Sequence, residues 1–112
     1  RVILESPYAG DITRNVDYAR RCLRDAIVNH NEAPLASHLL YTQPGVLDDA
    51  DPTERALGIE VGLWWGRLAE ATICYADYGI SAGMQQGIDR AVREGRPVVY
   101  RYIGEEQHGV GG

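Results

Sequence analysis

Apolar residues follow two spacings along this chain, one typical of buried strands and one typical of amphipathic helices. Short apolar runs predict four strands, near residues 2–5, 35–40, 72–76 and 98–103. Apolar residues repeating at intervals of three and four predict helices from about residue 13 to 28, from 54 to 69 and from 82 to 94. Strands and helices therefore alternate, which predicts an α/β fold with a mostly parallel sheet and helices on both faces.

Capping residues support the expected helix boundaries. Asp11 or Thr13 is suited to cap the first helix, because a short polar side chain there can accept from a free backbone N–H group. Asp51 followed by Pro52 is typical of the start of the second helix. Gly95 follows the third helix and is a natural stop.

The second helix carries more apolar residues than one small core should use. Four of them form a stripe on one face: Leu57, Val61, Trp64 and Leu68. The helix also carries Gly58, Gly62 and Gly66, each of which costs about 1 kcal/mol relative to Ala. Close packing against another helix, in a partner subunit or in the same domain, would offset that cost. We therefore expect a homodimer or a larger homo-oligomer.

Composition narrows the class of protein. The length of 112 residues suits one domain, which we place at residues 1–104, with a flexible tail at 105–112. Eleven basic and sixteen acidic residues give a charge of −5, which disfavours nucleic acid as a partner. Cys22 and Cys74 lie in apolar patterns and are expected to be buried thiols. No metal or cofactor is expected, nor a membrane span, and a cytoplasmic location is the default.

The loops after the first and third strands have the composition of ligand-binding turns. Ser6 and Gly10 lie in one loop, and Ser81 and Gly83 in the other. Each pair offers a hydroxyl group and close backbone approach near a helix N-terminus, where anions bind readily. In open α/β sheets, ligands bind at the carboxyl ends of strands, so both loops should share one edge. The alternative is that each serine only caps its helix.

The order of motifs resembles that of the nucleoside 2-deoxyribosyltransferase-like superfamily, in particular its small phage and bacterial members. The matching segments extend from Val2 to Ile103 and comprise Ser6–Asp11 with Asn15, Ser37–Leu39 with Thr42 and Gln43, Leu47–Asp49 with Arg55 and Gly58, and Ser81–Met84 with Ala91. The resemblance implies a Rossmann-like three-layer domain with a four- to five-stranded sheet. It also implies a homo-oligomer with shared sites, and a small nucleotide-like ligand whose N-glycosidic bond is cleaved or exchanged.

The resemblance also assigns residues. The expected ligand- or phosphate-binding residues are Ser6, Pro7, Tyr8, Gly10, Asn15, Ser81, Gly83 and Met84. The family pattern S-x-G-(V/M)-x-x-E places a nucleophilic glutamate at Gly87, which has no carboxylate. Gly87→Glu should then raise base release, provided the helix tolerates the side chain.

Other acids could substitute for the missing glutamate. Asp48 and Asp49 are the best candidates, because their loop could reach the site. Asp77 and Glu60 are further candidates but are expected to be solvated side chains. His38 could act as a base near neutral pH, or be a core or loop residue.

Three functions remain open from the sequence. The first is a nucleotide-binding protein that has lost its hydrolytic centre. The second is an active N-glycosidase or deoxyribosyltransferase that uses another acid. The third is an interaction protein with a vestigial pocket, whose working surface includes Trp64 and Trp65.

Overall fold

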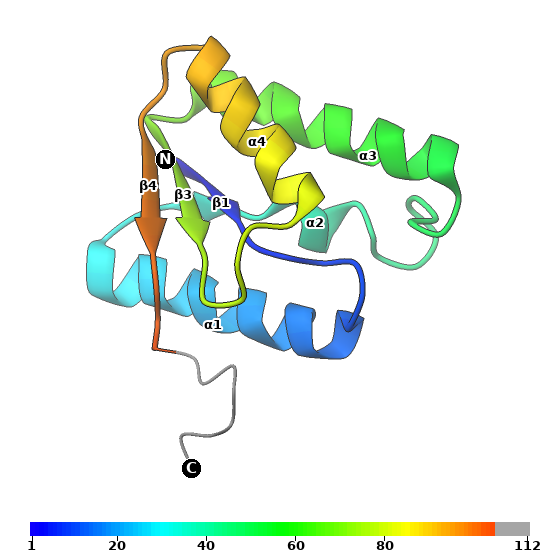
Figure 1. The fold of residues 1–112 in the computed structure, drawn as a ribbon, viewed down its shortest axis with the longest axis horizontal. Helices are drawn as coiled ribbons and strands as arrows, with labels where there is room; N and C mark the ends of the chain where they lie inside the picture. Colours follow the sequence, from blue (N-terminus) through cyan, green and yellow to red (C-terminus); the bar gives the residue numbers. More distant parts are fainter. Residues whose placement is uncertain (105–112) are drawn as a thin grey trace.

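Four parallel strands form the centre of the computed structural model, which describes residues 1–104 (Figure 1). The strands are β1 (Val2–Glu5), β2 (Pro34–Leu35), β3 (Ala71–Tyr75) and β4 (Val98–Arg101). Their order in the sheet is β2-β1-β3-β4, and every neighbouring pair is parallel. The predicted α/β class is confirmed, and the arrangement is consistent with a Rossmann-like three-layer fold. The tail expected at 105–112 lies outside the described residues.

Helices cover both faces of the sheet. Helix α1 (Ile12–His30) lies on one face, and α3 (Pro52–Trp64) and α4 (Ala82–Arg93) lie on the other (Figure 1). A short helix α2 (Ser37–Leu40) follows β2, and a 3₁₀ turn η1 (Trp65–Leu68) extends α3. In residues 1–104, none of the helices has both the length and the apolar character needed to cross a membrane.

The predicted caps are confirmed. The carboxylate of Asp11 accepts from the backbone N–H of Arg14 at 3.1 Å, and that of Asp51 accepts from Thr53 at 2.9 Å. The hydroxyl of Ser81 accepts from the N–H of Met84 at 3.2 Å. Each side chain satisfies a donor that the helix leaves free, which fixes where α1, α3 and α4 begin.

The strands send alternate side chains to opposite faces of the sheet. On the α1 side, Leu4 and Ile73 pack with Tyr18 and Cys22 in the larger core cluster. On the other side, the smaller cluster contains Cys74 of β3 and residues Met84 and Ile88 of α4. Both cysteines are buried free thiols, as predicted.

The strand predicted at 35–40 is wrong beyond its first residue. Strand β2 pairs with β1 only at Pro34 and Leu35, and α2 begins at Ser37. The backbone turns because local bonds favour the helix: the N–H of Tyr41 donates to the carbonyl of Ser37, and the Thr42 hydroxyl donates to that of His38. The apolar run therefore folds into a helical turn beside the sheet, which brings His38 toward the end of β1.

The apolar stripe predicted on the second helix is not its buried face. Trp64 and Leu68 are 60% and 59% exposed, whereas Gly62 and Gly66 are buried. A Cβ at Gly62 would overlap the hydroxyl of Ser37, and one at Gly66 would meet the guanidinium of Arg96 at 2.6 Å. The glycine stripe therefore allows close packing within this chain, the second of the two explanations left open.

Candidate functional site

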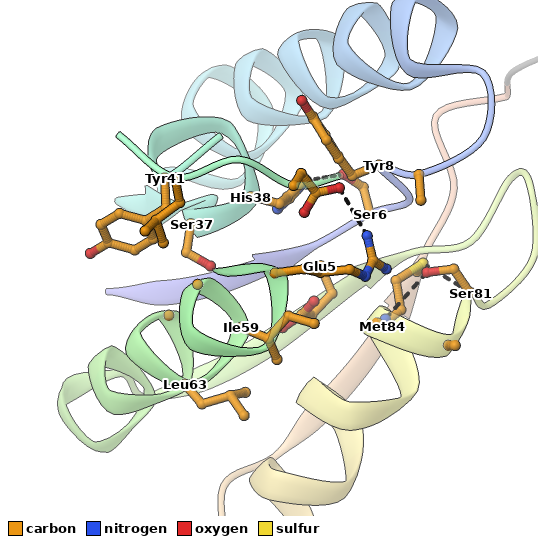
Figure 2. A pocket seen from close by; sticks show the side chains of 18 of the residues that line it. Glu5, Ser6, Tyr8, Ser37, His38, Tyr41, Ile59, Leu63, Ser81 and Met84 are labelled. Atoms are coloured by element: carbon orange, nitrogen blue, oxygen red, sulfur yellow. Dashed lines mark hydrogen bonds and ion pairs between the residues drawn. The ribbon is translucent and has the colours of Figure 1, made fainter. Parts of the chain in front are cut away.

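A cleft with a volume of about 220 Å³ opens at the carboxyl ends of β1 and β3. Its walls come from the loop after β1, from α2, from one face of α3 and from the first turn of α4 (Figure 2). This is the edge where ligands bind in open α/β sheets. The sheet and three helices thus bring together segments far apart in the sequence.

The two loops singled out from the sequence meet in this cleft. Of the expected ligand-binding residues, those that line it are Ser6, Tyr8, Ser81, Gly83 and Met84. The other three, Pro7, Gly10 and Asn15, are not among its lining residues. The amide of Asn15 donates to the carbonyls of Tyr8 and Ala9 at 2.9 and 3.0 Å, so this side chain supports the shape of the loop.

The candidate acids have different positions. Asp49 lines the cleft and pairs with Arg55 at 2.9 Å. Asp48 lines only an adjoining hollow along the 42–50 loop. Glu60 is exposed on α3 and pairs with Arg90 at 3.0 Å.

Asp77 is a buried structural residue. It is only 4% exposed, so the expectation that it is solvated is wrong. Its carboxylate accepts from the Tyr18 hydroxyl at 2.5 Å and from the backbone N–H groups of Ile103 and Gly104, both at 3.0 Å. The side chain therefore joins the loop after β3 to α1 and to the end of β4, away from the cleft lining.

The carboxylate that the sequence analysis missed is Glu5, the last residue of β1. It lines the cleft, among side chains from the β1 loop, α2, α3 and α4 (Figure 2). A Cβ at Gly87 would overlap Oε2 of Glu5. The carboxyl group of Glu5 therefore fills the space that any side chain at Gly87 would enter. The available signal was the strand period, which puts Glu5 on the face opposite the buried Leu4.

Burial governs the ionisation of Glu5. Loss of solvent raises its pKa to about 8, an effect only partly offset by the positive charge of Arg96. That guanidinium is held by the Gly66 carbonyl at 2.7 Å, Glu94 at 2.8 Å and the Thr72 hydroxyl at 2.9 Å. Glu5 is consequently mostly a neutral acid at pH 7 and can donate a hydrogen bond or a proton.

Ser6 and His38 form a neutral pair beside Glu5. Oγ of Ser6 lies 2.7 Å from Nε2 of His38, and both residues line the cleft (Figure 2). Burial lowers the pKa of His38 to about 4, so its imidazole is uncharged at pH 7. Of the two alternatives left open for His38, this lowered pKa favours an uncharged structural residue over a base near neutral pH. The pair instead offers an uncharged polar wall.

The first turn of α4 closes the other side of the cleft. Ser81 acts as the predicted cap, and its backbone N–H faces Sδ of Met84 at 3.4 Å. The Ser81 hydroxyl accepts one bond in this cap and retains its own O–H for a ligand. Capping and ligand contact, which seemed alternatives in the sequence, are compatible in this geometry.

Comparison with protein-family models matches residues 1–101 to a family described as a domain of unknown function (DUF7768). No curated protein and no solved structure gives a significant match. The matched region contains all four strands and every residue that lines the cleft. On this match, the chain belongs to the DUF7768 family.

Proposed function

We propose that this chain binds a nucleoside or nucleotide in the cleft and cleaves its N-glycosidic bond, with Glu5 as the acid. The observation that carries the proposal is the position of Glu5 against Gly87. The resemblance to nucleoside 2-deoxyribosyltransferases places a carboxylate at Gly87, and the carboxyl group of Glu5 reaches the same space from β1.

The protonated state of Glu5 suits a general acid. N-glycosidic cleavage builds positive charge on the sugar and negative charge on the departing base. In the proposed step, the C1′–N bond breaks, its electron pair stays on the base nitrogen, and that nitrogen takes the proton of Glu5. Water then adds to C1′ and returns a proton to the carboxylate. The net reaction is hydrolysis, and Glu5 is regenerated.

The same ionisation argues against a covalent route. With a pKa of about 8, Glu5 is ionised in only about a tenth of molecules at pH 7. A nucleophile must be ionised, whereas a general acid must be protonated. Proton donation is thus the role that the environment of Glu5 favours.

Binding without turnover is the second candidate function. It is favoured by Gly87 itself, because a site that resembles this superfamily lacks the glutamate at its usual position. Ser6, Ser81 and Gly83 could still contact a ligand, since none of them depends on that carboxylate.

One panel separates these functions. The protein is incubated with the common 2′-deoxynucleosides and their 5′-monophosphates, while free base is measured by chromatography and binding by thermal shift. Glu5→Gln should lower base release by about 100-fold or more, because Gln has no acidic proton, and should keep the thermal shift. Glu60→Gln is the matched control, since Glu60 lies on α3 outside the cleft lining.

Each outcome of the panel has a defined meaning. Base release that depends on Glu5 supports the glycosidase. A thermal shift with no release from the wild-type protein supports the binding function. If the wild-type protein shows neither a thermal shift nor base release with any ligand of the panel, both functions are refuted.

A further inference from the structure

Acidic side chains dominate the charged groups of the cleft. Its lining carries the charged side chains of Asp49, Glu54 and Arg55, together with Glu5 and His38, which are mostly neutral at pH 7. The adjoining hollow is lined by Asp48, Asp49 and Glu54, with no Lys or Arg among its described lining residues. A phosphate group carries a charge of about −1.5 to −2 at pH 7, so it would face like charges from the 42–50 loop and from α3.

Arg55, the one cation among the described residues that line the cleft, already has a partner. Arg55 donates through Nη1 to Oδ2 of Asp49 at 2.9 Å. To bind a phosphate, Arg55 would have to share its charge with an anion while Asp49 stayed in the same wall. The pair is therefore close to neutral and does not make a phosphate site.

Two other arginines, Arg96 and Arg14, already bind other groups of the protein. Arg96 donates to Gly66, Thr72 and Glu94 and does not line the cleft. The guanidinium of Arg14 lies 4.1 Å from the centre of the Tyr78 ring and donates to Asn15. Among the described residues, the N-terminus of α4 could still attract an anion, and the carboxylate of Glu54 in the same cleft opposes that attraction.

The uncharged groups of the cleft match a different ligand. Ser6 with His38, and the hydroxyls of Ser37 and Tyr41, can bond to the hydroxyls of a sugar. Apolar side chains from α3 and α4 offer a surface for the face of a base: Ile59, Leu63 and Met84. We infer that the ligand is an uncharged nucleoside in preference to its 5′-phosphate, an inference that rests on the proposed function and specifies its substrate class.

Titration calorimetry of the wild-type protein with matched nucleosides and 5′-monophosphates tests this inference. At about 50 mM NaCl, the preferred nucleoside should bind at least about tenfold more tightly than its monophosphate. At about 300 mM NaCl the ratio of the monophosphate Kd to the nucleoside Kd should decrease, because salt screens the repulsion between the phosphate and the acidic wall.

Two variants test the origin of the preference. Asp49→Asn removes one acid and frees Arg55, so monophosphate binding should improve severalfold relative to nucleoside binding. Glu54→Gln should shift the ratio in the same direction. Glu60→Gln, outside the cleft lining, should leave it unchanged.

The failures can be told apart. A monophosphate that binds as tightly as its nucleoside, or a ratio that salt and Asp49→Asn do not change, overturns this inference and leaves the proposed function standing. If neither the nucleosides nor the monophosphates bind, the proposed function is refuted, and the inference with it.

Discussion

At the scale of single residues, Glu5 is held in an environment that lowers the stability of the fold. The Glu5 side chain is half-buried beside Cys74 and Gly87, with Arg96 as the opposing charge. A functional acid is often retained at a cost in stability, because its environment is tuned to its chemistry.

The pH dependence of stability follows from the raised pKa of Glu5. Between its ordinary value of 4.5 and about 8, the unfolded chain has lost the proton that the folded chain keeps. The contribution of Glu5 to the free energy of unfolding should therefore decrease as pH rises through this window, by at most about 1.4 kcal/mol per pH unit, whereas His38, with its lowered pKa, contributes in the opposite direction below its ordinary value of 6.5. Glu5→Gln should remove that slope and unfold at a higher urea concentration at pH 8. If the free energies of unfolding of the wild-type protein and Glu5→Gln change in parallel from pH 5 to pH 8, the raised pKa of Glu5 is contradicted.

Gly87 and Glu5 compete for the same space. Gly87→Ala should destabilise the protein by about 1–3 kcal/mol, because its Cβ would overlap the Glu5 carboxylate. The same change in a Glu5→Ala background should be tolerated, and the double-mutant cycle in urea should show strong coupling. The gain in base release expected for Gly87→Glu should therefore require a paired exchange, in which Glu5→Ala makes room for Gly87→Glu. Additive effects would show that the two residues are not in contact.

At the scale of elements, glycines in two different helical segments, η1 and α4, have different consequences. Gly66 lies against the buried guanidinium of Arg96, whereas a Cβ at Gly83 would meet no atom within 4 Å. Gly66→Ala should lower the free energy of unfolding by about 1–3 kcal/mol, since the arginine would lose its bonds to Gly66 and Thr72. Gly83→Ala should be neutral or stabilising by about 0.5–1 kcal/mol. Equal effects in urea denaturation would contradict the packing described for α3.

Local signals predicted most of the elements. The caps Asp11, Asp51 and Ser81 and the apolar periods located α1, α3 and α4 to within a few residues. The segment after Leu35 was misassigned because a short apolar run does not distinguish a strand from a helical turn. The sequence also did not reveal which face of α3 is exposed, because its glycines make the close contacts and its large apolar residues do not.

At the scale of the whole molecule, sequence order predicted which loops would meet. The parallel sheet brings Ser6 and Ser81 into one cleft, as the alternation of elements required. The contact of Glu5 with Gly87 could not be predicted in this way, because it depends on how α4 packs on the sheet. The partner of Arg55 and the burial of Asp77 likewise depend on the tertiary structure and could not be predicted from the sequence.

A homodimer stays a prediction, and the exposed apolar residues at the end of α3 identify where to test it. Trp64 and Leu68 are largely exposed, and Val92 of α4 is 68% exposed. Light scattering at micromolar concentration should give about twice the 12.4 kDa chain mass. Trp64→Ser combined with Leu68→Ser should shift the protein to monomer. A wild-type monomer at that concentration would contradict the prediction.

The pH dependence of base release by the wild-type protein tests the role of Glu5 most directly. If Glu5 is the general acid, kcat should be constant from about pH 6 to pH 7 and decrease above about pH 8, as its proton is lost. Glu5→Gln should give a low rate with no such decrease. A rate that increases through pH 8 as Glu5 ionises, or a profile that Glu5→Gln leaves unchanged, would contradict the account.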